Sequence, residues 1–454
     1  MQAEAVEHLF QSVLPYDIIV EEARKLGVVK RARKLDPALL VMSLVMMGGS
    51  SEAGRLAAAI RDYRDRGGPQ VARSASYRWF DEEFLALMEV LVGRAKAYLA
   101  EMPLHLPGVL AGRKDWRAVD STVVKLPKEL RASFEGTGDY AALKVHDEVS
   151  LGLENVVDWH ITPAKRHDGP ELVVDEGRRG TGLLIDLGYV SHKLFRDCEE
   201  HDVHVVARLK NGWKVWLDDD VRFQQAQRWE VPDEFMDKLG VEKLPDELAF
   251  PLDVDVRLGD LKQGVRARLV NIETPAGWRA YLTNVPRDTH DAEAIAFLYS
   301  LRWSVEIQHK LAKSGCKLGA IQAEKPVGAK ILVHAAFLAS LLANALAHLE
   351  HLDQGYVGEK CVRPTGQRPP VHAMLMWKML QCSAPGIAQL LGGQNAGGRG
   401  WEHYADVLRH AGRDANWRSK PSPIDDAKGR NPAGRPMRRH RKKTAKEKAA
   451  GKVR

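Results

Sequence analysis

The sequence predicts an α/β protein in which helices flank a mixed sheet. Three stretches of alternating polar and apolar residues follow one another after residue 113, and helical and strand-like stretches then alternate. Helical periodicity dominates on both sides of this region. With 454 residues, of which 44% are hydrophobic, the chain can bury a large core and can hold two to four structural units.

Residues 1–105 are predicted to form a helical domain that binds DNA. Its clearest helices are expected at Ile18–Leu26, Pro37–Met47, Glu52–Arg61 and Asp81–Leu99. Five arginines surround the segment Ser74–Phe80, and such a unit could place a helix in a DNA groove. These are Arg61, Arg64, Arg66, Arg73 and Arg78. Arginines near helix ends are more often ordinary surface charges, so DNA binding here does not follow from composition alone.

The sheet is expected in residues 113–350. Its first strands are predicted at Trp116–Val124, Leu143–Leu151 and Leu153–Ile161. A helix at Pro170–Arg178, a strand at Gly182–Ile185, a helix at Ser191–Glu200 and a strand at Val203–Leu209 then alternate. A β-rich segment from about 212 to 285 follows, with strands at Leu252–Leu258, Val265–Asn271 and Trp278–Leu282. Helices return near Asp291 and include the apolar run Ile331–Leu349, which polar residues interrupt, so we expect a buried helix and no membrane span.

The C-terminal part of the chain divides into two regions. Residues 351–412 are predicted to be a helical region, with helices at Val371–Leu380 and around Ile387–Leu391. Residues 413–454 are predicted to be a basic disordered tail. From Ala427 to the end the chain has twelve Lys or Arg and one acidic residue, so the net charge of +7 leaves −4 for the rest. Such a tail could solubilise the protein, contact nucleic acid, or do both.

Cysteine usage and the N-terminal sequence indicate a cytoplasmic protein. The four cysteines lie far apart, at Cys198, Cys316, Cys361 and Cys382. Their spacing indicates neither a disulfide framework nor a cysteine-based zinc site, which fits a reducing compartment. The first residues are acidic and lack the basic and then apolar order of a signal peptide.

A polar stripe marks the stretch Tyr299–Lys313, which reads as a helix. At about 100° per residue, four side chains fall within an arc of about 60°: Tyr299, Arg302, Glu306 and Lys313. A carboxylate beside Tyr, Arg and Lys suits an acid that binds a divalent cation next to groups that hold phosphate. Because Arg302 and Glu306 are also an ordinary i,i+4 pair, a solvated helix with ion pairs explains the stripe equally well.

Two further carboxylates lie in or directly after predicted buried strands, where they could bind a metal ion. Asp120 lies in the first predicted strand, and Asp186 directly follows the buried strand Gly182–Ile185. An acid in such a place is costly to bury unless it faces a crevice or binds a cation. Asp120 and Asp186 are therefore candidates for one metal site, to which a returning helix could bring Glu306. Three acids with no nearby Cys and no ordered His cluster favour Mg²⁺ or Mn²⁺ over zinc.

Other side chains in this region are expected to be structural. The competing acids are Asp115, Asp139, Asp147, Asp158 and Asp168. Acids near strand ends are usually caps or solvated loop residues. Base stacking is conceivable for Trp213, Trp216 and Trp303, but core packing is the expected role. The scattered histidines are expected to be structural or surface residues, namely His146, His160, His167 and His192.

With these residues in view, the sequence resembles the DDE transposases of bacterial insertion sequences. In the insertion-sequence-four family the third acid lies in a Y-x2-R-x3-E-x6-K signature, and the four residues of the stripe match it at every spacing. Asp120-Ser-Thr resembles the family's D-S-T around the first acid, and Asp186-Leu-Gly-Tyr resembles its D-x-G-Y around the second. The resemblance spans about Trp116 to Leu349.

The resemblance implies a ribonuclease-H-like mixed sheet with a β-rich insertion before the acidic helix, and Asp186 and Glu306 are indeed 120 positions apart. It implies that Asp120, Asp186 and Glu306 hold two Mg²⁺ or Mn²⁺ ions. One ion would activate water or a DNA 3′-hydroxyl, and the other would stabilise the leaving oxygen. It also implies that Tyr299, Arg302 and Lys313 hold phosphates of the transferred DNA end.

The predicted function is therefore DNA transposition. The protein would bind double-stranded DNA at the terminal inverted repeats of an insertion sequence, cleave the ends and join them to target DNA, as a homodimer on the bacterial chromosome. A nuclease with the same core that only hydrolyses DNA is one alternative. A non-catalytic DNA-binding protein derived from a transposase is another, although the three intact acids give it little support. Glycoside hydrolysis by an acid pair is disfavoured, because the acids lie beside Arg and Lys and an eightfold βα repeat is missing.

Overall fold

The computed structural model describes ten stretches of the chain: 1–29, 35–46, 56–104, 106–210, 213–217, 251–259, 264–274, 277–355, 371–393 and 397–413. Much of the predicted β-rich segment and the predicted tail beyond Arg413 lie outside them. The chain divides into two compact units. The first comprises Met1–Leu106, Arg117–Asp168 and Trp303–Arg430, and the second comprises Pro107–Trp116, Gly169–Arg302 and Asn431–Arg454. The chain thus leaves the first unit and later returns to it.

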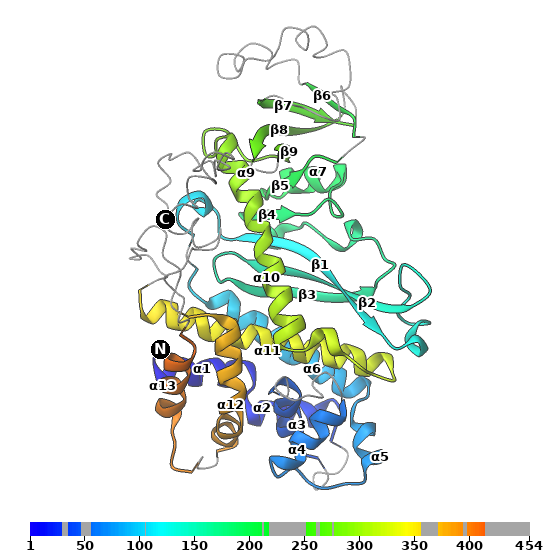
Figure 1. Cartoon of the computed structure of the whole chain (residues 1–454), viewed down its shortest axis with the longest axis vertical. Helices are drawn as coiled ribbons and strands as arrows, with labels where there is room; N and C mark the ends of the chain where they lie inside the picture. The colour runs from blue at the N-terminus through cyan, green and yellow to red at the C-terminus, as the bar shows by residue number, and fades with distance from the viewer. Residues whose placement is uncertain are drawn as a thin grey trace, which may run out of the picture. The chain divides into compact units, whose positions relative to one another are not determined.

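Helices from both ends of the sequence build most of the first unit (Figure 1). The N-terminal helices are α1 Ala3–Val13, α2 Tyr16–Lys25, α3 Pro37–Met46, α4 Leu56–Asp65, α5 Arg73–Ser76 and α6 Glu82–Glu101. The later helices are α10 Ser304–Lys310, α11 Pro326–Asp353, α12 Ala373–Leu391 and α13 Trp401–Ala411. The predictions that correspond to α2, α3 and α6 are confirmed within two residues at each end, and α1 was not predicted.

A three-stranded antiparallel sheet completes the first unit. Its strands are β1 Trp116–Leu126, β2 Ala141–Ser150 and β3 Asn155–Pro163, with β2 in the centre. In this register Asp120 of β1 lies directly opposite Asp147 of β2. Because side chains alternate between the two faces of a sheet, directly opposite residues share a face. The two aspartates therefore lie side by side on one face.

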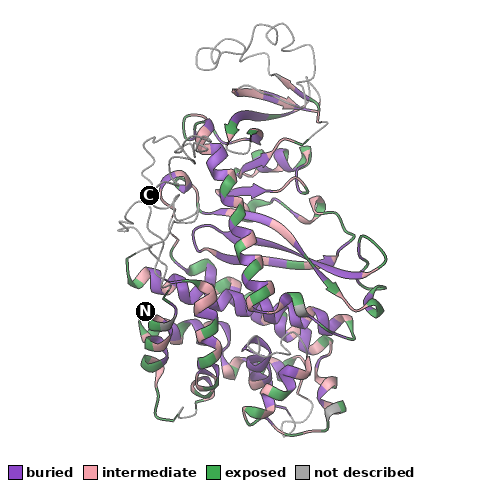
Figure 2. Cartoon of the chain, viewed as in Figure 1, coloured by how far each residue is buried: buried purple, intermediate pink, exposed green. Residues whose placement is uncertain are grey.

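Helix α11 is the core of the first unit. It contacts α3, α6, α12 and β3, and it is buried along most of its length (Figure 2). Its contact with β3 includes the indole of Trp159, which donates a hydrogen bond to Nδ1 of His334 (3.1 Å) and stacks on Phe337. Among the helices described, α11 is the one long and apolar enough to cross a membrane, and its whole apolar window is buried in protein. The prediction of a buried helix at Ile331–Leu349 is confirmed.

The second unit contains a mixed six-stranded sheet. Its strands, in spatial order, are β4 Gly182–Ile185, β5 His204–Arg208, β9 Gly277–Thr283, β8 Val265–Thr274, β7 Leu252–Leu258 and β6 Val215–Leu217. Strands β4 and β5 are parallel and are joined by helix α7, His192–Glu200, whereas the remaining pairs are antiparallel. Helices α7 and α9, Ala292–Ser300, both pack on β5 and β8. The predicted α/β class is therefore correct.

Two element predictions are wrong. The helix predicted at Pro170–Arg178 is two short 3-10 turns, because the Asp175 carboxylate accepts the N–H of Gly177 (3.0 Å) and so competes with helical hydrogen bonding. The two helices predicted between Val371 and Leu391 are the single helix α12, which continues through Pro385. The Tyr404 side chain of α13 packs against this helix at Gly386, and such packing offsets the one backbone hydrogen bond that proline removes.

The helix predicted at Tyr299–Lys313 is confirmed, but its helix type changes along the stretch. Helix α9 ends at Ser300, a 3-10 turn covers Leu301–Trp303, α10 follows, and a π-helix covers Leu311–Gly315. A 3-10 turn advances about 120° per residue and a π-helix advances less than an α-helix, so a wheel at one fixed angle does not describe this segment. π-Helices of this length are frequent at functional sites.

Candidate active site

Two aspartates lie side by side on the sheet of the first unit. Asp120 is partly buried, and its Oδ1 accepts the N–H of Ser121 (2.7 Å). The side chain of Asp147, opposite it on β2, is completely buried. Two like charges directly opposite each other destabilise a sheet unless a cation or a donor compensates them. This face of the sheet is therefore suited to bind positive charge.

Helix α10 packs on β2 and supplies such a donor. Nε2 of His309 lies 2.7 Å from Oδ1 of Asp147. Burial lowers the pKa of His309, but the charges of Asp147 and Asp120 outweigh burial and raise the pKa overall. Glu306 precedes His309 by one helical turn, and residues three apart lie on the same side of a helix. The structure thus brings the helix that carries Glu306 against the strands that carry Asp120 and Asp147.

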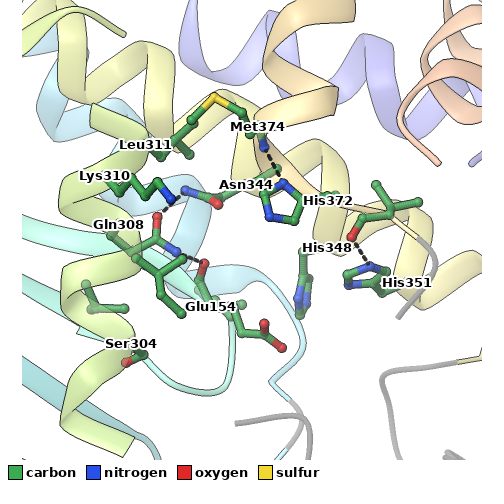
Figure 3. A pocket seen from close by; sticks show the side chains of 16 residues that line it. Glu154, Ser304, Gln308, Lys310, Leu311, Asn344, His348, His351, His372 and Met374 are labelled. Carbon is green, nitrogen blue, oxygen red and sulfur yellow. Dashed lines mark hydrogen bonds between the residues drawn. The ribbon is translucent and has the colours of Figure 1, made fainter. Parts of the chain in front are cut away.

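Side chains next to His309 fix α10 on its other side. The Gln308 amide donates to the backbone carbonyl of Glu154 (2.8 Å) in the β2–β3 turn and accepts the amide N–H of Asn344 (2.7 Å) from α11 (Figure 3). These side chains line a cavity of about 420 Å³. The hydrogen bonds hold α10 between the β2–β3 hairpin and α11 without any help from the pair His309–Asp147.

Lys313 lies in the π-helix that follows α10. Its charge lowers the pKa of His309, against the effect of the acids, so its ammonium group lies within electrostatic range of the histidine. The last carbonyl of the π-helix, that of Gly315, accepts the indole N–H of Trp377 from α12 (3.0 Å). Tertiary packing therefore helps to set the helix type at Lys313.

The second unit brings three other predicted residues together. Asp186 follows β4, at the carboxyl end of a parallel strand pair, and is partly buried. Tyr299 of α9 packs on Tyr281, and the Arg302 guanidinium lies 5.9 Å from the centre of the Tyr299 ring. Burial raises the pKa of Tyr299, the charge of Arg302 opposes this shift, and the charge of Asp186 adds to it. Asp186, Tyr299 and Arg302 are thus electrostatic neighbours. The charge of Arg208 also lowers the pKa of Tyr299.

Most of the competing acids have ordinary structural roles. The Asp168 carboxylate accepts hydrogen bonds from Nζ of Lys144 (2.9 Å) and from the Ser121 hydroxyl (3.0 Å). Asp139 and Asp158 form ion pairs on the surface, with Arg131 and Lys96. Asp147 is the exception that sequence reasoning missed, together with His309. Residues 127–140 separate β1 from β2, so no tight turn fixes the register that places Asp147 opposite Asp120.

The three tryptophans predicted to pack in the core differ in their surroundings. Trp303 is 55% exposed, so the expectation that it packs in the core is wrong. The ring of Trp213 lies 4.4 Å from that of His192, and the Trp216 indole donates to the carbonyl of Gly259 (3.4 Å), so both have packing contacts. Of these three tryptophans, Trp303 is thus the one with a largely exposed side chain.

A groove of about 1020 Å³ lies in the first unit, between the α5 region, the end of β1 and the segment before α11. Three basic side chains line it, from three separate segments: Arg78, Lys125 and Lys325. Glu129 and Glu324 line it as well. Two of the arginines expected to face DNA hold the local fold instead, since Arg64 donates to the carbonyl of Val71 (2.7 Å) and Arg66 pairs with Asp62.

The residues of the first unit fit a divalent metal ion. Asp120 and Asp147 offer carboxylate oxygens on one face, and hard oxygen ligands are those that Mg²⁺ and Mn²⁺ prefer. Oδ2 of Asp147 is buried and has no hydrogen-bond partner within the described part of the chain. An orphaned buried carboxylate oxygen is rare in folded proteins and points to a missing water or ion.

Comparison with known proteins assigns the family. The model of the transposase DDE domain matches residues 112–342, just over half of the 454 residues. The chain belongs to the DDE transposase family. Membership implies that this DDE transposase acts on DNA with the help of divalent metal ions. The resemblance to DDE transposases of insertion sequences is thus confirmed, whereas the four-residue signature stays a prediction.

Individual relatives of this DDE transposase agree with that assignment. The transposase for insertion sequence element IS231C of Bacillus thuringiensis subsp. berliner is 21% identical over 347 residues, which cover 68% of this chain and 72% of the relative. The putative transposase InsL for insertion sequence element IS186A of Escherichia coli K12 is 39% identical over 81 residues, or 17% of this chain and 22% of the relative. A cryo-EM structure of the piggyBac transposase synaptic complex with hairpin DNA covers 85% of this chain at 11% identity, with a TM-score of 0.43, too low to support an argument from shape.

Proposed function

We propose that this DDE transposase cleaves DNA at the terminal inverted repeats of its insertion sequence and transfers the freed 3′ ends to target DNA. The observation that carries the proposal is the placement of α10, with Glu306, against the strands of Asp120 and Asp147 in a chain of this family. Asp120, Asp186 and Glu306 would hold two Mg²⁺ or Mn²⁺ ions on a ribonuclease-H-like core. Bound there, the ions supply Lewis-acid stabilisation of the attacking and leaving oxygens.

The remaining residues of the signature would hold the DNA. Arg302, which is partly buried against the Tyr299 ring, suits bidentate contact with a phosphate. Lys313, one turn beyond α10, would neutralise a second phosphate. Exposed Trp303, between Arg302 and α10, would meet an unstacked base. Together these side chains would orient the scissile phosphate toward the three carboxylates.

A test of this assignment replaces each carboxylate by its amide. Asp120→Asn, Asp186→Asn and Glu306→Gln should each abolish cleavage and strand transfer in Mg²⁺ and leave binding to inverted-repeat DNA within about twofold, because an amide is a poor ligand for Mg²⁺. Gel assays with 3′-labelled ends measure the three activities. Asp139→Asn, a surface acid of the same region paired with Arg131, is the matched control and should behave as wild type.

Normal strand transfer by any of the three variants would refute the assignment. A wild-type protein that cleaves labelled ends but never joins them to a target duplex would be a nuclease with the same core. Two ends must meet for concerted transfer, so we expect a homodimer on DNA in the bacterial cytoplasm.

The N-terminal helical region, residues 1–105, would contribute to DNA binding through the groove of about 1020 Å³. The basic side chains that line the groove would neutralise backbone phosphates of the DNA. Arg78→Glu, Lys125→Glu or Lys325→Glu should therefore weaken DNA binding. Each should also reduce the slope of log Kd against log salt concentration by about one per lost phosphate contact. Fluorescence anisotropy at several salt concentrations measures both quantities. Lys128→Glu, an exposed lysine near the end of β1 that does not line the groove, is the control. Equal effects of all four changes would show only a general charge effect.

A further inference from the structure

Asp147 and His309 form a buried pair whose geometry is not explained by holding the fold together. The side chain of Asp147 is 0% exposed and that of His309 is 12% exposed. One carboxylate oxygen, Oδ1, lies 2.7 Å from Nε2 of His309. The other, Oδ2, is buried without a partner in the described stretches. In a purely structural ion pair, such an unsatisfied buried oxygen would cost desolvation free energy without any return.

A purely structural role for the pair would also be redundant. Gln308, the neighbour of His309, already joins α10 to the β2–β3 turn through Glu154 and to α11 through Asn344. Replacing a buried ion pair by apolar side chains of similar size is often neutral or stabilising. Neither the packing of α10 nor stability therefore requires an acid at position 147.

Several charged groups act on the Asp147 carboxyl group. Complete burial raises the pKa of the Asp147 carboxyl, His309 opposes this, and the charges of Asp120 and Glu148 add to it. The charge of Lys313, in the π-helix, lowers the pKa of His309. Glu148 follows Asp147 on β2, so its side chain lies on the opposite face, where it pairs with Arg117 (3.2 Å). On its own face Asp147 has Asp120 as its cross-strand neighbour.

We propose that Asp147 and His309 are positioning residues of the metal site. His309 holds Asp147 by Oδ1, which leaves Oδ2 to accept a hydrogen bond from the hydration shell of a divalent ion bound at Asp120. Mg²⁺ keeps several of its waters when it binds to protein, and residues that orient such shells tune metal affinity. This inference rests on the proposed function, because it places an ion at Asp120.

The experiment measures metal binding directly as well as activity. Binding of Mn²⁺ to the full-length protein without DNA is followed by electron paramagnetic resonance, and the Mg²⁺ concentration for half-maximal end cleavage is measured in parallel. Asp147→Asn should weaken both by about 10- to 100-fold. His309→Ala should act in the same direction, whereas His309→Gln, which keeps a donor for Oδ1, should restore part of the affinity. Glu148→Gln makes the same acid-to-amide change on the opposite face of β2 and should leave both values unchanged.

The outcomes separate this inference from the proposed function. If Asp120→Asn abolishes Mn²⁺ binding while Asp147→Asn and His309→Ala bind as wild type, the positioning role is overturned and the catalytic assignment stands. If Asp120→Asn binds Mn²⁺ and cleaves normally, the proposed function itself fails. Urea unfolding of each variant shows whether it is folded. Should Asp147→Asn fail to fold, wild-type affinity in folded His309→Ala alone overturns the proposal.

Discussion

Single side chains show that exposure and register, more than residue type, determine which groups can take part in the reaction. Trp303 and Trp377 have the same side chain, yet Trp303 is 55% exposed and Trp377 is 1% exposed. The indole N–H of Trp377 donates a hydrogen bond to the carbonyl of Gly315. Asp147 and Asp139 are both acids near strands, yet one lies opposite Asp120 and the other is on the surface. A role can therefore be assigned only after the neighbours of each side chain are known.

The exposure of Trp303 leads to a prediction about DNA. Trp303→Ala should change the free energy of unfolding by less than about 0.5 kcal/mol, as for most surface substitutions. It should lower strand transfer about tenfold, because base stacking on an aromatic ring contributes about 1–3 kcal/mol. Urea unfolding and strand-transfer assays measure the two effects. Trp377→Ala should instead lose about 3–5 kcal/mol of stability, as expected for a buried tryptophan. Unaltered strand transfer by Trp303→Ala would remove the residue from the site.

At this scale the sequence predicted Asp120, Asp186 and Glu306 as candidates from their places in strands and helices, but it did not predict Asp147 or His309. A strand pattern shows that residues alternate between faces, whereas the cross-strand partner of each residue depends on the length and geometry of the turn. His309 was missed for a related reason. Its significance depends on which strand α10 covers, and local periodicity does not contain that information.

At the scale of elements, one buried arginine connects β7, β8 and the segment before α9. The Arg268 guanidinium of β8 forms two hydrogen bonds to the Asp253 carboxylate of β7 (2.8 and 2.7 Å). It also donates to the carbonyls of Val285 (3.1 Å) and His290 (2.8 Å). At 3% exposure, Arg268 has nearly all of its donors satisfied by protein. The Arg268 side chain thus joins two strands of the second unit to the segment that leads into α9.

Removing this side chain should unfold the second unit readily. Arg268→Ala leaves the Asp253 side chain, which is 11% exposed, with Arg287 as its remaining ion-pair partner among the described residues. Breaking a buried ion pair from one side costs about 3–5 kcal/mol. Urea unfolding followed by tryptophan fluorescence measures the loss. Arg266→Ala, an exposed position on the same strand, should cost less than about 0.5 kcal/mol. Similar losses for the two variants would mean that the network around Asp253 contributes little.

Elements with strong local patterns were predicted well. Strand β7 was predicted with its observed bounds, because alternation and flanking turn residues define it within a few positions. The stretch Tyr299–Lys313 was predicted as helical, but its change from 3-10 to α to π hydrogen bonding was not. That change depends on tertiary contacts, such as the hydrogen bond between Trp377 and Gly315. A helical wheel uses sequence spacing alone and does not include such contacts.

For the molecule as a whole, one buried and one partly buried histidine make stability depend on pH. Burial lowers the pKa of His334 in the first unit to about 4, and the charges of Lys96 and Lys330 contribute. Burial also lowers the pKa of His204 in the second unit to about 4, with a contribution from Arg113. In the unfolded chain each histidine would titrate near 6.5. Both units therefore contain a histidine that is neutral when folded.

The sign of the effect follows from proton counting. Between pH 6.5 and 4 the unfolded chain binds more protons than the folded one, so stability should fall as the pH is lowered through this window and level off above it. For His334 the full effect is about 3 kcal/mol. Urea unfolding at pH 7, 6, 5 and 4.5 measures the slope. His334→Gln keeps an acceptor for Trp159 but does not titrate in this window, so its slope should be shallower. An equal slope would exclude His334 as a cause.

The α/β class could be predicted because strand and helix patterns are local, but the division into two interrupted units could not. That division rests on contacts between residues far apart in sequence. An example is the hydrogen bond from the Asn155 amide to the carbonyl of Leu341 (3.1 Å), which ties β3 to α11. Composition and periodicity describe each segment by itself, and they do not say which distant segments share a core.

The interrupted first unit also constrains the order in which the protein can be made. Asp120 leaves the ribosome long before the helix that carries Glu306, and α6 and β3 have no α11 to bury them until about residue 353 has been added. At about 5–20 residues per second, synthesis of the chain from its first residue to residue 353 takes about 20–70 seconds. A chain that a premature stop codon ends before residue 306 lacks both α11 and Glu306. Such a fragment should be degraded by the cell's proteases and should not cleave DNA.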